Sequence, residues 1–203
     1  VRLFDSGKVG DQLYYTMPVV RGKTLRDVLE ALREGGQAAR REWSLARRVP
    51  HASLGTFPTP VERLGHMGHE SLWIKREDLS SPVHGGNKVR KLEFTLAEAM
   101  REGRGKVVTM GGLGTNHGLA TAIFCGKLGM ATRLLLYDQP VTRQVRETLL
   151  LLHRHGAELR SYDTLLGAAV AMYTSQRLLN PRAYVLDSGG SSPLGTVGVV
   201  NAM

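Results

Sequence analysis

The 203-residue sequence has little cysteine, few aromatic residues and no long apolar run. Cys125 is the single cysteine, so no disulfide can form within the chain, and we expect an intracellular, cytoplasmic protein. No apolar run approaches the roughly 20 residues that a membrane-spanning helix needs. Residues 1–5 lack the charged-then-apolar layout of a secretory signal. We therefore predict no membrane partner, and the apolar stretch 122–128 favours a buried structural role for the Cys125 thiol.

Positive charge is in excess, because 27 lysines and arginines outnumber 18 aspartates and glutamates and leave a formal charge of +9. A nucleic-acid partner is one explanation of such a surplus. The basic residues are dispersed, however, and no zinc-finger spacing or RNA-binding motif occurs, so we predict no nucleic-acid partner. The other explanation is an acidic second half of the protein that balances this one.

From residue 106 onward, strand patterns alternate with helix patterns. Such alternation predicts βαβ units and an α/β fold, with an open, mostly parallel sheet flanked by helices. The loops that follow parallel strands lie at one edge of the sheet, where open α/β folds bind their ligands. The expected strands are 106–110, 131–137, 158–162 and 183–186, and the expected helices are 116–128, 142–155, 165–179 and one from about 192.

The chain before residue 106 is less regular. We expect an extended piece at 13–20 and helices from Thr24 and over 37–47, then a strand at 71–75 and a helix at 88–101. His66 and His69 have a spacing that metal ligands use, but no third ligand lies near them in the sequence. We therefore predict no metal site.

The first candidate loop, residues 84–93, leads from two glycines into a basic helical turn. The helix dipole and the neighbouring Arg90 and Lys91 disfavour the protonated form of Lys88, and a lysine with a lowered pKa suits a Schiff base. Lys91 follows at helical spacing, so it can face the same way and meet an anion such as a phosphate. The alternative is a solvated basic first turn.

The second candidate loop, residues 111–117, has the sequence GGLGTNH and joins a strand to a helix. Backbone N–H groups in such a turn suit a carboxylate or phosphate. Thr115, Asn116 and His117 place a hydroxyl, an amide and an imidazole at the helix start. The alternative is a plain helix cap, for which threonine and asparagine are both suited.

The third candidate loop, residues 187–195, has the sequence DSGGSSPLG. It is typical of a phosphate cradle at a helix N-terminus, where Pro193 suits the first turn. A structural turn of small residues is the alternative. The glycine loops also leave a nucleotide-binding α/β module open, although the dinucleotide fingerprint spacing is absent.

Taken in order, five motifs resemble the 1-aminocyclopropane-1-carboxylate deaminase / D-cysteine desulfhydrase family of pyridoxal-phosphate (PLP) enzymes. The resemblance covers about residues 54–203, and the string GGNKVRKLE is highly specific. It implies PLP fold type II, the tryptophan-synthase-β-like fold. The motifs are FPTPVER at 57–63, KRED at 75–78, GGNKVRKLE at 85–93, GGLGTNH at 111–117 and GGSSPLG at 189–195.

The resemblance also implies roles for individual residues. Lys88 would carry PLP covalently and Lys91 would bind its phosphate. Asn116 would bond the ring oxygen. Thr115 would act at the substrate, and because the family usually has serine there, its added methyl disfavours cyclopropane ring opening. The implied cofactor-binding residues are Asn87, Lys88, Lys91 and Asn116, and the implied substrate-binding residues are Gly112, Thr115, Asn116 and His117.

The implied activity is that of a PLP-dependent lyase or deaminase that acts on a small amino acid and releases ammonia, with desulfhydration as first choice. Family members are longer, so we expect this chain to be the N-terminal part of such an enzyme. It would form a homodimer or associate with a missing C-terminal half. A non-catalytic fragment or paralogue is the alternative. The expected segments are an extension at 1–53, the start of a large domain at 54–104, a small α/β domain at 105–186 and a truncated return to the large domain at 187–203.

Overall fold

The computed structural model describes residues 6–9, 12–15, 49–64, 72–176 and 180–200. The chain divides into two compact units, residues 1–45 and 46–203. In the first unit, strands β1 (Ser6–Val9) and β2 (Gln12–Tyr15) form an antiparallel pair. Several expected features lie outside the described residues: the rest of the extended piece at 13–20, the helices from Thr24 and over 37–47, and the pair His66 and His69.

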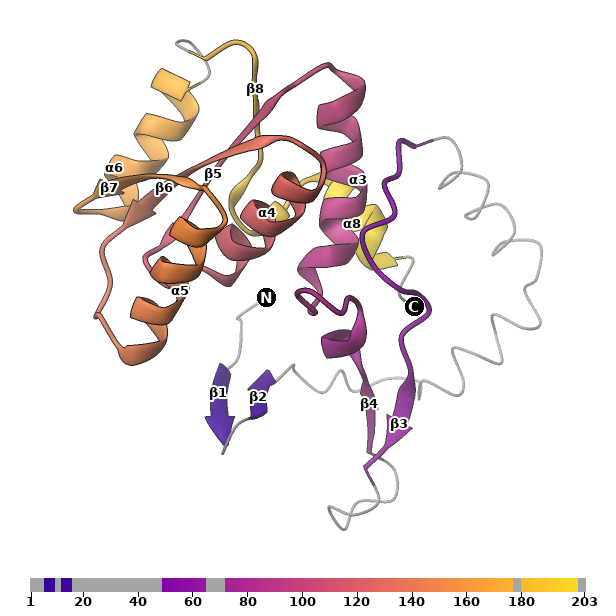
Figure 1. The fold of residues 1–203 in the computed structure, drawn as a ribbon. Helices are drawn as coiled ribbons and strands as arrows, with labels where there is room; N and C mark the ends of the chain where they lie inside the picture. The colour runs from indigo at the N-terminus through magenta and orange to yellow at the C-terminus, as the bar shows by residue number, and fades with distance from the viewer. Residues whose placement is uncertain (1–5, 10–11, 16–48, 65–71, 177–179, 201–203) are drawn as a thin grey trace. The chain divides into compact units, whose positions relative to one another are not determined.

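The second unit is built on a four-stranded sheet in the order β7-β6-β5-β8. All three strand pairings are parallel, which confirms the predicted α/β fold (Figure 1). The chain moves from β5 through β6 to β7, and then returns to the far side of β5 for β8. This reversal leaves a topological switch between β5 and β8, and open α/β sheets bind ligands at such a point. The strands are β5 (Lys106–Gly112), β6 (Ala131–Tyr137), β7 (Glu158–Tyr162) and β8 (Ala183–Val185).

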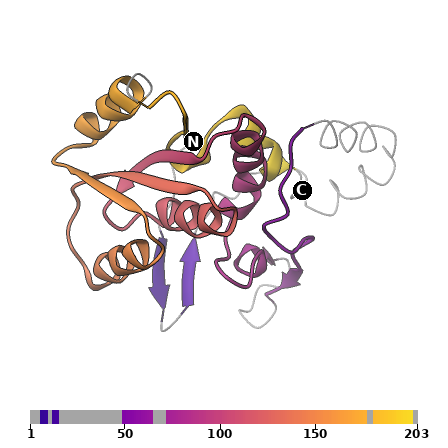
Figure 2. The ribbon, with the colours of Figure 1, turned by 45° about the horizontal axis from the view of Figure 1, so that its top comes forward.

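Helices cover both faces of this sheet (Figure 2). On one face, α4 (Asn116–Lys127) and α5 (Arg143–Arg154) bury apolar side chains against Leu134 and Leu136 of β6. On the other face, α6 (Leu165–Val170) continues into the π-helical turn η3 (Ala171–Gln176) and packs on β5 and β6. The predicted helix 165–179 is thus seen as far as residue 176. None of the helices described is long and apolar enough to cross a membrane.

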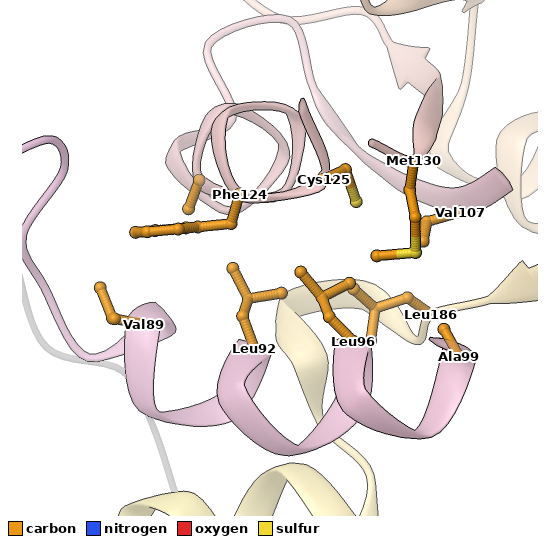
Figure 3. Packing of buried hydrophobic residues seen from close by; sticks show 10 residues of the cluster. Val89, Leu92, Leu96, Ala99, Val107, Phe124, Cys125, Met130 and Leu186 are labelled. Atoms are coloured by element: carbon orange, nitrogen blue, oxygen red, sulfur yellow. The ribbon is translucent and has the colours of Figure 1, made fainter. Parts of the chain in front are cut away.

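Helix α3 (Lys88–Arg101) lies on the same face of the sheet as α4 and α5. Its apolar residues recur at helical spacing, and Figure 3 shows them meeting Phe124 and Cys125 of α4 in one buried cluster. Cys125 is fully buried, as predicted, and burial raises the pKa of its thiol to about 11. The α3 residues of this cluster are Val89, Leu92, Leu96 and Ala99.

Helix α8 (Pro193–Val200) packs against the outer side of α3. Gly198 makes this close approach possible, because a Cβ at that position would overlap the carbonyl oxygen of Arg90. Pro193 opens the helix, as expected for a residue whose missing N–H is no loss in a first turn. Between β8 and α8 the chain makes a short 3-10 turn, η4 (Ser188–Gly190), which lies beside the first turn of α3.

The strand expected at 71–75 is present in part. Its described part, β4 (Trp73–Lys75), pairs antiparallel with β3 (Val61–Arg63) and lies outside the parallel sheet. The lysine loop therefore does not continue a strand of the parallel sheet. Instead the chain passes through the turn η2 (Glu77–Leu79) into α3, and the packing of α3 on α4 and α8 brings Lys88 to that edge.

Candidate functional site

Two lysines of α3 meet the turn that follows β8. Lys88 Nζ lies 3.3 Å and Lys91 Nζ 3.2 Å from the carbonyl oxygen of Gly189, and both ammonium groups donate to it. Their i, i+3 spacing puts both side chains on one side of the helix. Gly189 and Gly190 have φ values of 69° and 64°, a left-handed conformation that glycine adopts without strain. The first and third candidate loops therefore come together.

His117, from the second candidate loop, completes this convergence. Its side chain is buried, with 7% of its surface exposed, and its Nε2 lies 3.1 Å from the hydroxyl oxygen of Thr109 on β5. A Cβ on Gly190 would lie 3.8 Å from His117 Cε1 and 3.4 Å from Lys91 Cδ. His117 and Lys91 thus flank the space that a side chain at Gly190 would fill.

Burial lowers the pKa of Lys88, Lys91 and His117, and nearby positive charge lowers it further for Lys88 and His117. Burial lowers the pKa of Lys88, and the charge of Lys91 lowers it further. Burial also lowers the pKa of Lys91. The pKa of His117 falls to about 3, first through burial and then through the two lysines, so its imidazole is neutral at neutral pH. The site therefore combines an amine that deprotonates more easily than usual with a positive charge suited to an anion.

Thr115 caps helix α4. Its hydroxyl oxygen accepts a hydrogen bond from the backbone N–H of Gly118 at 3.1 Å, which is the structural role left open in the sequence analysis. The same side chain packs so closely on Gly111 that a Cβ there would overlap it. A catalytic role for Thr115 stays a prediction.

The three remaining predicted site residues differ in their exposure to solvent. Asn87 precedes α3 and Asn116 opens α4, and both are exposed. Gly112 is buried at the end of β5, where a Cβ would overlap the side-chain oxygen of Gln139. Gln139 also lies against Gly114, since a Cβ there would be 3.0 Å from its Nε2. Gln139 was not predicted from the sequence. It could have been, because it lies in the loop that follows the parallel strand β6.

The opposite side of α3 holds a partly buried ion pair between Arg90 and Glu77. Arg90 donates to both carboxylate oxygens of Glu77, through Nε at 2.7 Å and Nη2 at 2.9 Å. The hydroxyl of Thr59 donates to the same carboxylate at 2.6 Å, and the Arg90 guanidinium lies 4.0 Å from the centre of the Phe57 ring. Burial acts to raise the pKa of Glu77, but the hydrogen bonds from Arg90 and Thr59 leave it below its usual value. These contacts tie the segment 57–59 to α3.

Glu93, one turn after Arg90, is also buried. Its Oε1 accepts hydrogen bonds from the backbone N–H groups of Leu54 at 3.0 Å and Gly55 at 3.2 Å, and its Oε2 lies 3.2 Å from His51 Nε2. The motif GGNKVRKLE therefore serves two purposes. Its lysines face the glycine turn at 189–190, while its arginine and glutamate fasten the preceding segment of chain.

The residues at the glycine turn fit a cofactor that carries an aldehyde and a phosphate. Lys88 offers an amine with a lowered pKa, and Lys91 offers a second cation beside it. Gly190 leaves space between Lys91 and His117, and His117 Nδ1 is a buried nitrogen without a hydrogen-bond partner in the described part of the chain. A buried polar atom of this kind calls for a bound group.

The fold and the site together define an α/β chain of PLP fold type II. Residues 52–203 match the family model described as pyridoxal-phosphate dependent enzyme, and the chain belongs to this family. It is 32% identical over 168 residues to a putative 1-aminocyclopropane-1-carboxylate deaminase of Pyrococcus abyssi, a match that covers 79% of this chain and 50% of that protein. It is 35% identical over 167 residues to the D-cysteine desulfhydrase of Salmonella newport, with 76% and 50% covered.

A solved structure gives the same result. The crystal structure of an ACC deaminase homologue superposes with a TM-score of 0.67 at 32% identity, and the match covers 79% of this chain and 51% of that one. The chain thus spans about half the length of the relatives it matches. The resemblance found in the motifs is confirmed, and PLP is the cofactor of the family.

Proposed function

We propose that this chain carries the cofactor-binding lysine of a PLP-dependent lyase or deaminase that acts on a small amino acid and releases ammonia. The observation that carries the proposal is the meeting of Lys88 and Lys91 at the carbonyl oxygen of Gly189. Family membership supplies the cofactor, and Lys88 is the partly buried amine whose pKa is lowered at the convergence of the three loops.

The role that we propose for each side chain follows from its charge and its position. When bound, PLP supplies the electron sink for the reaction. Lys88 holds the cofactor through its amine, and it is also the group placed to move a proton at the α-carbon or β-carbon of the substrate. Lys91 holds the phosphate. Asn87 and Asn116 assist at the cofactor, while the turn from Gly112 to His117 binds the substrate carboxylate.

Among the activities of the family we favour desulfhydration of a cysteine-type substrate. The pair Asn116–His117 supports it, as does the identity with a D-cysteine desulfhydrase. Thr115 keeps the hydroxyl that serine provides in the family, but its methyl group packs on Gly118 and narrows the turn. The added methyl makes cyclopropane ring opening the less favoured reaction.

The test of Lys88 is spectroscopic. PLP added to the purified chain should give an absorbance band near the visible edge, and borohydride should fix the cofactor on Lys88, as located by peptide mapping. Lys88→Ala should abolish the band, whereas Lys127→Ala, which removes an exposed lysine at the end of α4, should leave it intact. A band that persists in Lys88→Ala contradicts the assignment. A band without release of ammonia from D-cysteine supports the alternative, a non-catalytic member of the family.

We further infer that another polypeptide covers the hairpin of β3 and β4. A two-stranded hairpin with exposed apolar residues is not stable by itself in water. The occupant that we favour is a second copy of the chain, and the segment equivalent to the second half of the relatives is the other outcome of the test. A dimer that Trp73→Ser dissociates, measured by light scattering, supports the first, and a monomer that binds the added second segment supports the second. The exposed apolar residues of the two strands are Val61, Trp73 and Ile74, with Leu72 just before β4 and Leu79 and Val83 in the segment after it.

A further inference from the structure

Thr109 lies inside β5 and is fully buried, next to the site but outside the motifs that define it. Its hydroxyl oxygen is 3.1 Å from His117 Nε2. Within the part of the chain that the structure describes, His117 is the one hydrogen-bond partner of this hydroxyl. A polar side chain at a central strand position that faces the helices is costly unless it is paired, and the hydrogen bond with His117 offsets this cost for Thr109.

The other ring nitrogen of His117 faces a different situation. Nδ1 has no access to solvent and no hydrogen-bond partner among the described residues. The neighbouring ring atom Cε1 is 3.8 Å from the point where a Cβ of Gly190 would stand, and Lys91 Cδ is 3.4 Å from the same point. His117 therefore borders the space beside Lys91, and its unpaired nitrogen is left for a ligand.

Counting hydrogen-bond donors decides which nitrogen carries the proton. A neutral imidazole has one N–H and one lone pair, and a threonine hydroxyl can donate or accept. If Thr109 accepted from Nε2–H, the hydroxyl hydrogen and the Nδ1 lone pair would both be buried without partners. If Thr109 donates to Nε2, its hydrogen is satisfied and a single unpaired group remains, an N–H on Nδ1. Each buried unpaired group costs free energy, so the second arrangement is favoured.

We propose that Thr109 is a positioning residue that holds His117 in the Nδ1–H tautomer, so that His117 donates a hydrogen bond to an anionic oxygen bound beside Lys91 and Gly190. The identity of the ligand as the cofactor phosphate or the substrate carboxylate rests on the proposed function. The tautomer does not, because it follows from the contacts of the unliganded chain. The burial that keeps the ring neutral also keeps a protonated imidazolium from binding the anion in its place.

The ¹⁵N spectrum of the histidine-labelled full chain tests this, because two-bond ¹H–¹⁵N couplings distinguish the two tautomers. The His117 signal is assigned by its loss in His117→Gln. The wild-type ring should be the Nδ1–H tautomer, and its Nδ1 signal should shift when the ligand oxygen arrives. Inorganic phosphate and PLP report a phosphate, while D-cysteine reports a carboxylate, and pyridoxal, which lacks both, should leave the signal unchanged. A shift with pyridoxal equal to that with PLP contradicts an anionic partner.

Three variants separate positioning from packing. Thr109→Val, which keeps the shape and removes the hydroxyl, should mix the tautomers and weaken about tenfold the binding of the ligand, PLP or D-cysteine, that shifts the Nδ1 signal. Thr109→Ser should restore both properties to near wild type. Thr121→Val is the matched control, since that buried hydroxyl donates to the backbone carbonyl of His117 at 2.8 Å and not to its ring. It should leave the tautomer unchanged.

The outcomes are distinct from those that test the proposed function. An absent absorbance band in the wild type would remove Lys88 as the cofactor lysine and leave the tautomer measurement standing. A wild-type His117 in the Nε2–H form overturns the role of Thr109, even where Thr109→Val does not fold. Unchanged tautomer and PLP affinity in a folded Thr109→Val protein overturn it as well, whatever happens at Lys88.

Discussion

The two sides of helix α3 carry charged residues at the same spacing and use them in opposite ways. Arg90 and Glu93 are buried and fully engaged, one in a two-point ion pair with Glu77 and the other with backbone N–H groups. Lys88 and Lys91 share a single neutral carbonyl oxygen, and each has a lowered pKa. Paired buried charges hold structure, whereas poorly paired amines are available for chemistry.

This difference explains why the motif is so long. A cofactor lysine alone would need one residue and a glycine turn, but α3 must also be anchored to the irregular chain before it. Arg90 binds the segment that contains Thr59, and Glu93 binds the segment that contains Leu54. Four charged residues within six positions therefore fix the helix on one side and present amines on the other.

The largest effect on stability should come from breaking the ion pair between Arg90 and Glu77. Arg90→Leu leaves the carboxylate of Glu77 without its cation, and because Glu77 is only partly buried, we expect the free energy of unfolding to fall by about 3–4 kcal/mol, the lower part of the range for a buried pair. Arg76→Leu is the control, because Arg76 pairs with Asp78 and Glu62 at the surface, where water screens the charges, and its loss should be clearly smaller. Urea unfolding measures both. A loss in Arg90→Leu no larger than in Arg76→Leu would show that α3 is anchored in another way.

Glu93 should come second. Glu93→Leu leaves the N–H groups of Leu54 and Gly55 unpaired, and because each buried unpaired group costs about 1–3 kcal/mol, we expect a loss of about 2–4 kcal/mol. Glu93→Gln keeps an amide oxygen for these donors and should lose about 1 kcal/mol or less. The same urea titrations report the difference. Equal losses in the two variants would mean that the charge, and not the acceptor, is what matters at this position.

A smaller effect is expected at the second loop, where the methyl group of Thr115 occupies the space that a side chain at Gly118 would need. A Cβ on Gly118 would lie 2.5 Å from Thr115 Cγ2, so Gly118→Ala should destabilise the chain by about 1–3 kcal/mol. Thr115→Ser removes the methyl and keeps the capping hydroxyl, so the cost of the alanine should fall in the double variant. A double-mutant cycle by thermal unfolding measures the coupling. Additive effects would indicate that the Leu134 side chain, 3.2 Å from the same Cβ position, sets the limit instead.

Part of the fold could be predicted from the sequence alone. Strands β6 and β7 have the predicted bounds, because apolar residues and glycine-bearing turns delimit them. β5 runs two residues further than predicted, through Gly111 and Gly112, since its pairing with Leu136 and Tyr137 of β6 continues past the apolar run. The antiparallel strand β3 was missed because three residues with a charged centre carry no strand pattern of their own.

The site was partly predictable for a similar reason. Helical spacing is a local property, so the common direction of Lys88 and Lys91 follows from the sequence. Their partner Gly189 is 101 and 98 residues away, and Thr109 is hidden in a strand, so contacts of this kind depend on the tertiary fold. The strand before the lysine loop was predicted, but its place outside the parallel sheet depends on its pairing with β3, and helix packing then brings the loop to the edge of that sheet.

The smallest effect should be a dependence of stability on pH that belongs to the lysines alone. The pKa of Lys88 and Lys91 is lower in the folded chain than the usual 10.5, so the unfolded chain binds more protons between the folded and unfolded values. Stability therefore rises as pH increases through this window. The stability gained in this way is lost as pH falls through the folded-state pKa values. Lys88→Met and Lys91→Met should each flatten the rise on the acid side of pH 10.5, measured by urea unfolding at fixed ionic strength. Lys127→Met, at an exposed position, should leave the slope unchanged. An equal slope in all four proteins would mean that the two amines are as well solvated as any surface lysine, and the contrast between the two sides of α3 would be lost.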